Sequence, residues 1–84
     1  MKKLITDVAD GLESLLGERV MLWCANYIYS GVVEGVSATC VKLTDAHVVY
    51  ETGELTSSEN KNTQQVGSDL YVQIAAVESF YVRQ

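Results

Sequence analysis

The segment LYVQIAAVESFYV, residues 70–82, decides the fold of this chain. It contains two short apolar runs that meet at Ala75-Ala76, without proline or glycine and with Glu78 as its one charged residue. Runs of this kind are typical of β-strands. A small protein rarely leaves such strands as open edges, because unpaired N–H and C=O groups recruit other chains. We therefore expect the two strands to pair with another copy of the chain, in a ring or another closed oligomer.

The length and composition indicate one domain, residues 1–84. A domain of this size buries only roughly 60–65% of the surface that its unfolded chain exposes, so association would stabilise it. The hydrophobic content of 48% excludes general disorder. The net charge of −5 excludes bulk attraction to nucleic acid, because phosphate binding depends mainly on Lys and Arg.

The sequence contains no sign of export or of a membrane anchor. Asp7, Asp10 and Glu13 interrupt the apolar residues near the start, so this stretch is not a signal peptide. No run approaches the ~20 apolar residues of a membrane span. Cys24 and Cys40 lack paired spacing, which is typical of reduced, buried thiols in an intracellular protein. We expect a cytoplasmic protein with no membrane partner.

The spacing of the apolar residues changes once along the chain. Steps of three and four residues in 4–16 predict an α-helix, and Gly17 suits its C-terminal cap. A period of two follows and predicts strands, while the polar residues 51–68 predict a loop or an extended hairpin tip. We expect a mainly β protein, with an N-terminal α-helix and a strongly bent five-stranded antiparallel SH3-like barrel. The barrel would span about residues 18–82, with strands at 20–25, 27–37 and 40–50 and two within 70–82.

Four segments resemble the motifs of the Sm/LSm/Hfq family in order and spacing. LGERVML at 16–22 resembles the junction of the family's helix and first strand, and GVVEGV at 31–36 resembles its second strand. VKLTDA at 41–46 resembles its third strand, and IAAVESF at 74–80 lies where its second motif lies. The resemblance covers nearly the whole chain. It implies an Sm-like fold and a cyclic homo-oligomer of roughly five to seven subunits, in which the fourth strand of one subunit pairs with the fifth strand of the next.

The chain departs from the family at the positions that hold RNA. In place of the family's Asp and Asn between strands two and three, which hold uracil, it carries Ser37 and Cys40. Ala75-Ala76 replaces Arg-Gly or Lys-His, and Asn26-Tyr27 replaces Asn-Gly. Hydrogen bonds from charged donors are stronger than neutral ones. We therefore expect any binding of single-stranded RNA to be weak or to use an atypical face.

Five residues are candidates for RNA contact by their positions. Trp23 lies near the position of an aromatic residue that Hfq uses to stack adenines, and stacking contributes about 1–3 kcal/mol per base. Alternatively, Trp23 packs beneath a neighbouring strand or subunit. Tyr27, with Tyr29, flanks a tight turn and either stacks bases or is half-buried with a hydrated hydroxyl. The remaining candidates lie in the turn between strands two and three: Ser37, Thr39 and Cys40.

The last two predicted strands supply the candidate oligomer interface. Alternatively, their apolar residues lie in the core of the monomer, and both interpretations can hold because a strand has two faces. The interface candidates are Tyr71, Val72, Ile74, Val77, Phe80 and Tyr81.

The sequence does not predict an enzyme. On a regular strand, Cys40 and His47 point to opposite faces, so they do not form a nucleophile–base couple. Asp45 shares a face with His47, and we expect a solvated pair. One His and two Cys without ligand spacing make a poor metal site, and no cofactor motif is present.

Two functional hypotheses follow. The first is an Sm-like ring that binds single-stranded RNA in an atypical way or assists RNA processing. The alternative is a ring-shaped scaffold that has lost RNA binding and recruits proteins through its polar loop or acidic surface, since Glu51, Glu54 and Glu59 lie in that loop.

Overall fold

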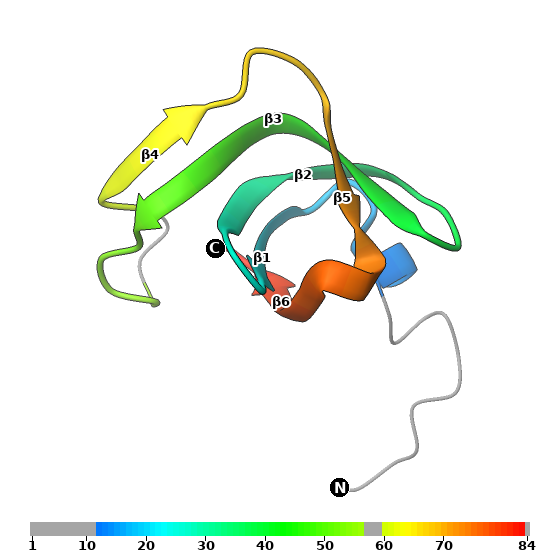
Figure 1. Cartoon of the computed structure of the whole chain (residues 1–84), viewed down its shortest axis with the longest axis horizontal. Helices are drawn as coiled ribbons and strands as arrows, with labels where there is room; N and C mark the ends of the chain where they lie inside the picture. The colour runs from blue at the N-terminus through cyan, green and yellow to red at the C-terminus, as the bar shows by residue number, and fades with distance from the viewer. Residues whose placement is uncertain (1–11, 57–59, 84) are drawn as a thin grey trace, which may run out of the picture.

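The computed structural model describes residues 12–56 and 60–83 and is mainly β (Figure 1). Its elements are the 3₁₀ turn η2 (Leu12–Leu15), β1 (Arg19–Cys24), β2 (Ile28–Val36), β3 (Cys40–Glu51), β4 (Asn62–Gln65), β5 (Leu70–Gln73), the 3₁₀ turn η3 (Ile74–Ala76) and β6 (Val77–Val82). The predicted break at Ala75-Ala76 is confirmed, because η3 separates β5 from β6 there.

The six strands form one antiparallel sheet in the order β4-β3-β2-β1-β6, and β5 pairs with the other end of β3. Figure 1 shows β3 as a long curved strand, with β4 beside one end and β5 crossing the other. The expected closed barrel is wrong, because this sheet does not close on itself. Since η3 is only three residues long, it carries the chain directly from β5, on β3, to β6, on β1.

The expected number of five strands is also wrong, because β4 forms a sixth. It lies within the predicted polar segment 51–68 and pairs with β3, Gln65 opposite His47 and Thr63 opposite Val49. Of the two alternatives predicted for this segment, a loop or an extended hairpin tip, the pairing supports the extended hairpin. All four β4 residues are exposed, so β4 lacks the apolar alternation that marks a half-buried strand.

The predicted N-terminal α-helix is not supported. Most of 4–16 lies outside the described residues, and the described part forms only the 3₁₀ turn η2. Gly17 adopts a left-handed φ of 85°, which ends the turn, and its N–H donates to the carbonyl of Val33 at 2.8 Å. At the position of the predicted helix cap, the N–H of Gly17 therefore bonds to the backbone of β2.

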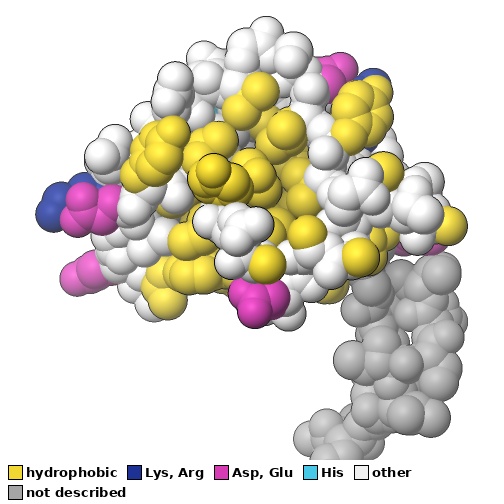
Figure 2. All heavy atoms as spheres, in the orientation of Figure 1, with side chains coloured by type: hydrophobic (Ala, Val, Ile, Leu, Met, Phe, Trp, Pro, Cys, Tyr) yellow, Lys and Arg dark blue, Asp and Glu magenta, His cyan; other side chains and the backbone are white. Residues whose placement is uncertain are grey.

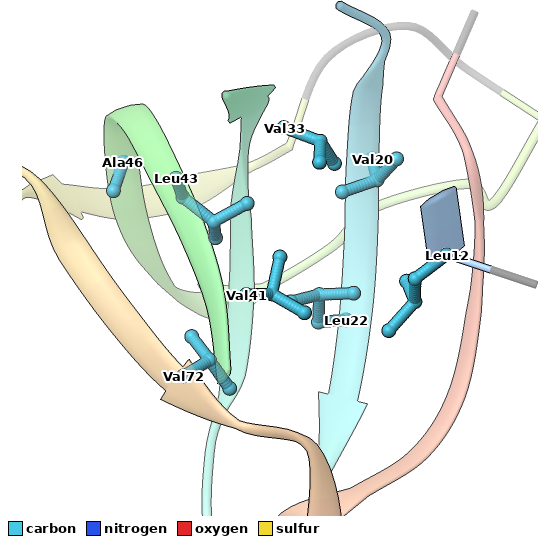
Figure 3. Packing of buried hydrophobic residues seen from close by; sticks show 8 residues of the cluster. All are labelled: Leu12, Val20, Leu22, Val33, Val41, Leu43, Ala46 and Val72. Atoms are coloured by element: carbon cyan, nitrogen blue, oxygen red, sulfur yellow. The ribbon is translucent and has the colours of Figure 1, made fainter. Parts of the chain in front are cut away.

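The hydrophobic core lies inside the bent sheet. Figure 3 shows its side chains pointing toward one another from β1, β2, β3, β5 and η2. In β1, alternate side chains point to opposite faces of the sheet, which explains why Val20 and Leu22 both point into the core. The cluster consists of Leu12, Val20, Leu22, Val33, Val41, Leu43, Ala46 and Val72.

A smaller buried cluster lies on the opposite face of β1. Met21 has no exposed surface there, and the amide of Asn60 lies 3.7 Å from its sulfur. Arg83, only 5% exposed, donates to the carbonyl of Thr52 at 3.3 Å. The segment between β3 and β4 therefore contacts the body of the protein and is not wholly solvated.

In the ranges 12–56 and 60–83, no helix has the length and apolar character needed to cross a membrane.

Candidate functional site

The turn between β2 and β3 holds three of the RNA candidates, and its hydrogen bonds are mostly internal. The hydroxyl oxygen of Ser37 accepts from the N–H groups of Thr39 at 3.2 Å and Cys40 at 3.0 Å. The carbonyl of Thr39 accepts from the N–H of Ile74 at 2.8 Å, which joins the turn to η3. Ser37 therefore shapes the turn, and its oxygen is already used.

A hollow of about 220 Å³ lies beside this turn and is lined in part by Cys40, Lys42 and Tyr71. The ammonium of Lys42 lies 5.8 Å from the ring centroid of Tyr71. It also lies 2.6 Å from a carboxylate oxygen of Glu34 and 3.5 Å from one of Asp69. The hydrogen bond with Glu34 raises the pKa of Lys42 above its ordinary value. The carboxylates of Glu34 and Asp69 therefore neutralise the charge of Lys42, and an RNA phosphate would need that charge to be free.

The other two RNA candidates, Trp23 and Tyr27, lie together at a second place. They line an open hollow of about 450 Å³ with Tyr50, Ile28 and Val49, which we call the aromatic hollow. Tyr27 is 56% exposed and Tyr50 59% exposed. The predicted RNA contacts therefore lie at two separate places, the turn between β2 and β3 and the aromatic hollow.

The three rings that line the aromatic hollow differ in their contacts. The indole nitrogen of Trp23 is buried and has no acceptor among the described residues. Tyr50 is held in place because its hydroxyl donates to the side-chain oxygen of Gln64 at 3.1 Å. The ring of Tyr27 lies 6.2 Å from that of Tyr29, at 43° to it. The rings are thus positioned before any ligand is present.

The interface candidates occupy three different environments. Val72 is in the core, and Ile74 and Val77 are half-buried against it. Tyr71 is 60% exposed. Phe80 stands opposite Leu22 on β1, so both side chains are on the core face, yet 37% of Phe80 is exposed. Tyr81 is half-buried beside Arg83, which donates to its hydroxyl at 3.4 Å.

The backbone of β6 has an outer side that no strand of the described ranges pairs with. The N–H of Arg83 donates to the carbonyl of Arg19 on β1 at 2.8 Å. Alternate N–H groups of an antiparallel strand point to opposite sides. The N–H groups of Tyr81 and Ser79 therefore point to β1, whereas those of Phe80 and Val82 point away from it.

An apolar cleft of about 230 Å³ lies between the β1–β2 turn and β5. Cys24, Tyr29, Leu70 and Val72 are among its lining residues, and the N–H of Ala25 donates to the carbonyl of Ala76 at 3.1 Å across one end. Figure 2 shows hydrophobic side chains gathered on the face between β2 and β5, with Lys and Arg only at its margins. Sequence reasoning missed this cleft because its two walls are 45 residues or so apart in the chain, roughly half its length.

Cys24 is one of the residues that line this cleft. Burial, with a smaller contribution from the carboxylate of Glu78, raises the pKa of its thiol above the ordinary value. The raised pKa lowers the fraction of thiolate, which is the reactive form, at neutral pH.

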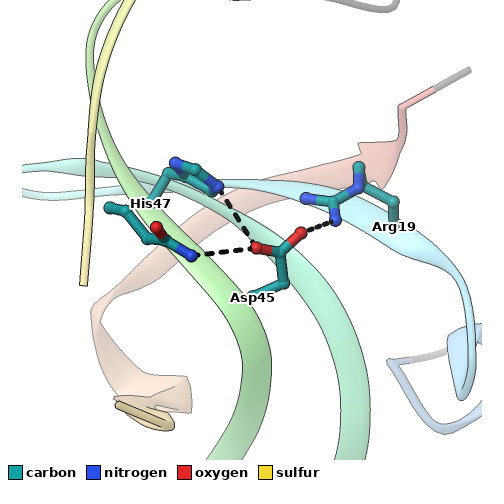
Figure 4. Close-up of polar contacts among 4 residues, drawn as sticks. Arg19, Asp45 and His47 are labelled. Atoms are coloured by element: carbon teal, nitrogen blue, oxygen red, sulfur yellow. Dashed lines mark hydrogen bonds and ion pairs between the residues drawn. The ribbon is translucent and has the colours of Figure 1, made fainter. Parts of the chain in front are cut away.

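Asp45, His47 and Arg19 form a polar cluster on the surface (Figure 4). Asp45 accepts a hydrogen bond from Arg19, lies 3.5 Å from Nε2 of His47 and accepts from Gln65 at 3.3 Å. The hydrogen bond from Arg19 holds the pKa of Asp45 below its ordinary value. The predicted Asp45–His47 pair is present, and Arg19 is an addition, because Val32 on β2 stands next to both Arg19 and Thr44.

Comparison of the sequence with models of known protein families and with curated proteins yields no match. Within the described part of the chain, no group of three or more His, Cys, Asp or Glu side chains is placed to hold a metal ion.

Proposed function

We propose that the chain is a subunit of an Sm-like homo-oligomeric ring and that the ring is a protein-interaction scaffold. The observation that carries the proposal is the pair of unlike edges of the sheet. One edge is β6, and the other is formed by β4 and β5 on β3. Two unlike edges favour head-to-tail pairing, which generates a ring when the rotation between subunits closes.

The side chains near these edges support the same assembly. Phe80 lies on the core face of β6, but a third of it remains exposed because nothing beyond the edge covers it. The apolar cleft lies beside β5, at the opposite edge. A neighbouring strand would supply partners for the outward N–H groups of Phe80 and Val82 and would cover apolar surface on both sides of the seam.

The charges favour a scaffold over an RNA-binding ring. The chain carries a net charge of −5, and Lys42, the one cation that lines a hollow at the β2–β3 turn, is compensated by two carboxylates. RNA binding depends on cations that are free to neutralise phosphates. Protein partners do not require them.

Binding of single-stranded RNA is the second candidate function. The observation that favours it is the aromatic hollow, where Trp23 and Tyr27 lie together and offer faces on which bases stack. Titration of labelled U-rich and A-rich oligonucleotides at low and moderate salt separates the two functions. The scaffold predicts no binding to either at low salt, whereas micromolar binding that Trp23→Ala abolishes would favour RNA.

The ring itself is tested by Phe80→Asp, with Phe80→Leu as the matched control. We expect Phe80→Asp to dissociate the assembly, because it buries an unpaired charge in the seam. The fold of the subunit should survive, since Phe80 is already partly exposed. Phe80→Leu keeps the seam apolar and should stay assembled. Native mass spectrometry with circular dichroism measures both, and a full assembly in Phe80→Asp would contradict the assignment of the seam.

A further inference from the structure

The aromatic hollow has the chemistry of a site for an extended peptide. Its rings come from two strands and the turn between β1 and β2: Trp23 is the penultimate residue of β1, Tyr27 lies just before β2 and Tyr50 is the penultimate residue of β3. The pairing of Ile28 with both Trp23 and Val49 brings these strand ends together. An open hollow with exposed aromatic walls suits a ligand that lies along the surface rather than a small molecule enclosed by it.

The charge around the hollow disfavours nucleic acid and favours a cationic ligand. Among the described residues, no Lys or Arg lines it. With a net charge of −5 on the chain, phosphates would be repelled and a basic residue beside the bound segment would be attracted.

The polar groups of the hollow match a backbone that has free carbonyls. Asn26 and Tyr27 line the hollow, and their side-chain amide and hydroxyl can donate hydrogen bonds to such carbonyls. A polyproline II helix has no internal hydrogen bonds, so its carbonyls accept from such donors while its proline rings pack on aromatic faces. The segment is already extended before it binds, so little conformational entropy is lost.

We infer that the aromatic hollow binds a proline-rich segment of a partner protein in the polyproline II conformation, with an Arg or Lys next to the prolines. The chain contains no proline, so the ligand is not a segment of this chain or of a second copy. The inference deepens the proposed scaffold function by naming its partner class, and a ring would present one hollow per subunit to repeated motifs.

The test is fluorescence anisotropy with a short labelled proline-rich peptide that ends in Arg and carries one motif, so that ring avidity does not contribute. Tyr27→Ala and Tyr50→Ala should each weaken binding by about tenfold or more, as loss of central aromatic contacts does. Leu16→Ala is the control, since Leu16 is 53% exposed and lies outside the hollow, and it should bind as the wild type does.

Three results would overturn the inference. The first is equal binding of an alanine-rich peptide with the same Arg, which would make the contact one of charge alone. The second is equal loss in Leu16→Ala, and the third is displacement of the peptide by an oligonucleotide at moderate salt. The mass of each variant is measured in parallel. A monomer that binds the peptide refutes only the ring, and a ring that does not bind it refutes only the hollow.

Discussion

Gly31 and Gly35 offer a matched pair of substitutions that tests the packing of β2, the strand that holds β1 and β3 together. A Cβ atom added at Gly31 would lie 3.0 Å from Cβ of Leu43 and 3.1 Å from the carbonyl oxygen of Thr44. The carbonyl belongs to β3 and cannot move without disturbing the β2–β3 pairing. At Gly35 the nearest atom is Cβ of Lys42, at an ordinary 3.9 Å.

The expected effects of the two alanine substitutions have opposite signs. Overpacking costs about 1–3 kcal/mol, and replacing glycine by alanine in a strand returns about 0.5–1 kcal/mol. At the middle of these two ranges, Gly31→Ala should therefore lose about 1.25 kcal/mol of unfolding free energy and about 5–10 °C of Tm. Gly35→Ala has no overpacking cost, so it should gain about 0.5–1 kcal/mol of unfolding free energy and raise Tm by about 2–8 °C.

Urea unfolding followed by the fluorescence of Trp23, and thermal unfolding followed by circular dichroism, measure both variants. Protein concentration must be the same in every sample, because assembly makes Tm depend on it. A Gly31→Ala protein as stable as the wild type, or a shift of both variants in one direction, would refute the close approach of β2 and β3 that the reasoning uses.

Three further predictions concern single residues. Leu22→Ala should lose about 2–5 kcal/mol in urea unfolding, because Leu22 is fully buried in the core, and a loss near zero would contradict that placement. Ser37→Ala should lose about 0.5–1.5 kcal/mol in the same assay, since it removes the acceptor of two turn N–H groups, and an unchanged stability would show that they find other partners. The lowered pKa of Asp45 means that its carboxylate stabilises the fold above the ordinary value of about 4 and that this stabilisation is lost as pH falls through the lowered pKa. Asp45→Asn should therefore be less sensitive to acid below about pH 4, and an ordinary titration of Asp45 by NMR would contradict the pairing with Arg19.

The sequence predicted the strands whose apolar residues alternate, β1 to β3, and the break at Ala75-Ala76. It did not predict β4, because Asn62–Gln65 is polar and exposed on both faces and pairs only through its backbone. It also predicted a closed barrel, which is wrong. Closure depends on which strands lie at the two edges of the sheet. The short η3 turn decides this, because it places β5 on β3 and β6 on β1, and composition does not.

The candidate site shows the same limit. Trp23 and Tyr27 are separate RNA candidates in the sequence, and the structure places both in one hollow. Tyr50 lies beside them only because β2 pairs with β3, and no local sequence pattern predicts that register. Arg19 reaches Asp45 in the same way, across β2. Contacts within one strand or turn follow from periodicity, whereas contacts between strands depend on register.

Light scattering of the wild-type chain across a dilution series tests the central claim most directly. The account predicts a constant mass of several times the 9.2 kDa of one chain, down to dilute samples. A folded particle of 9.2 kDa at every concentration would contradict it, because the edges of β6, β4 and β5 would then be stable without a neighbour.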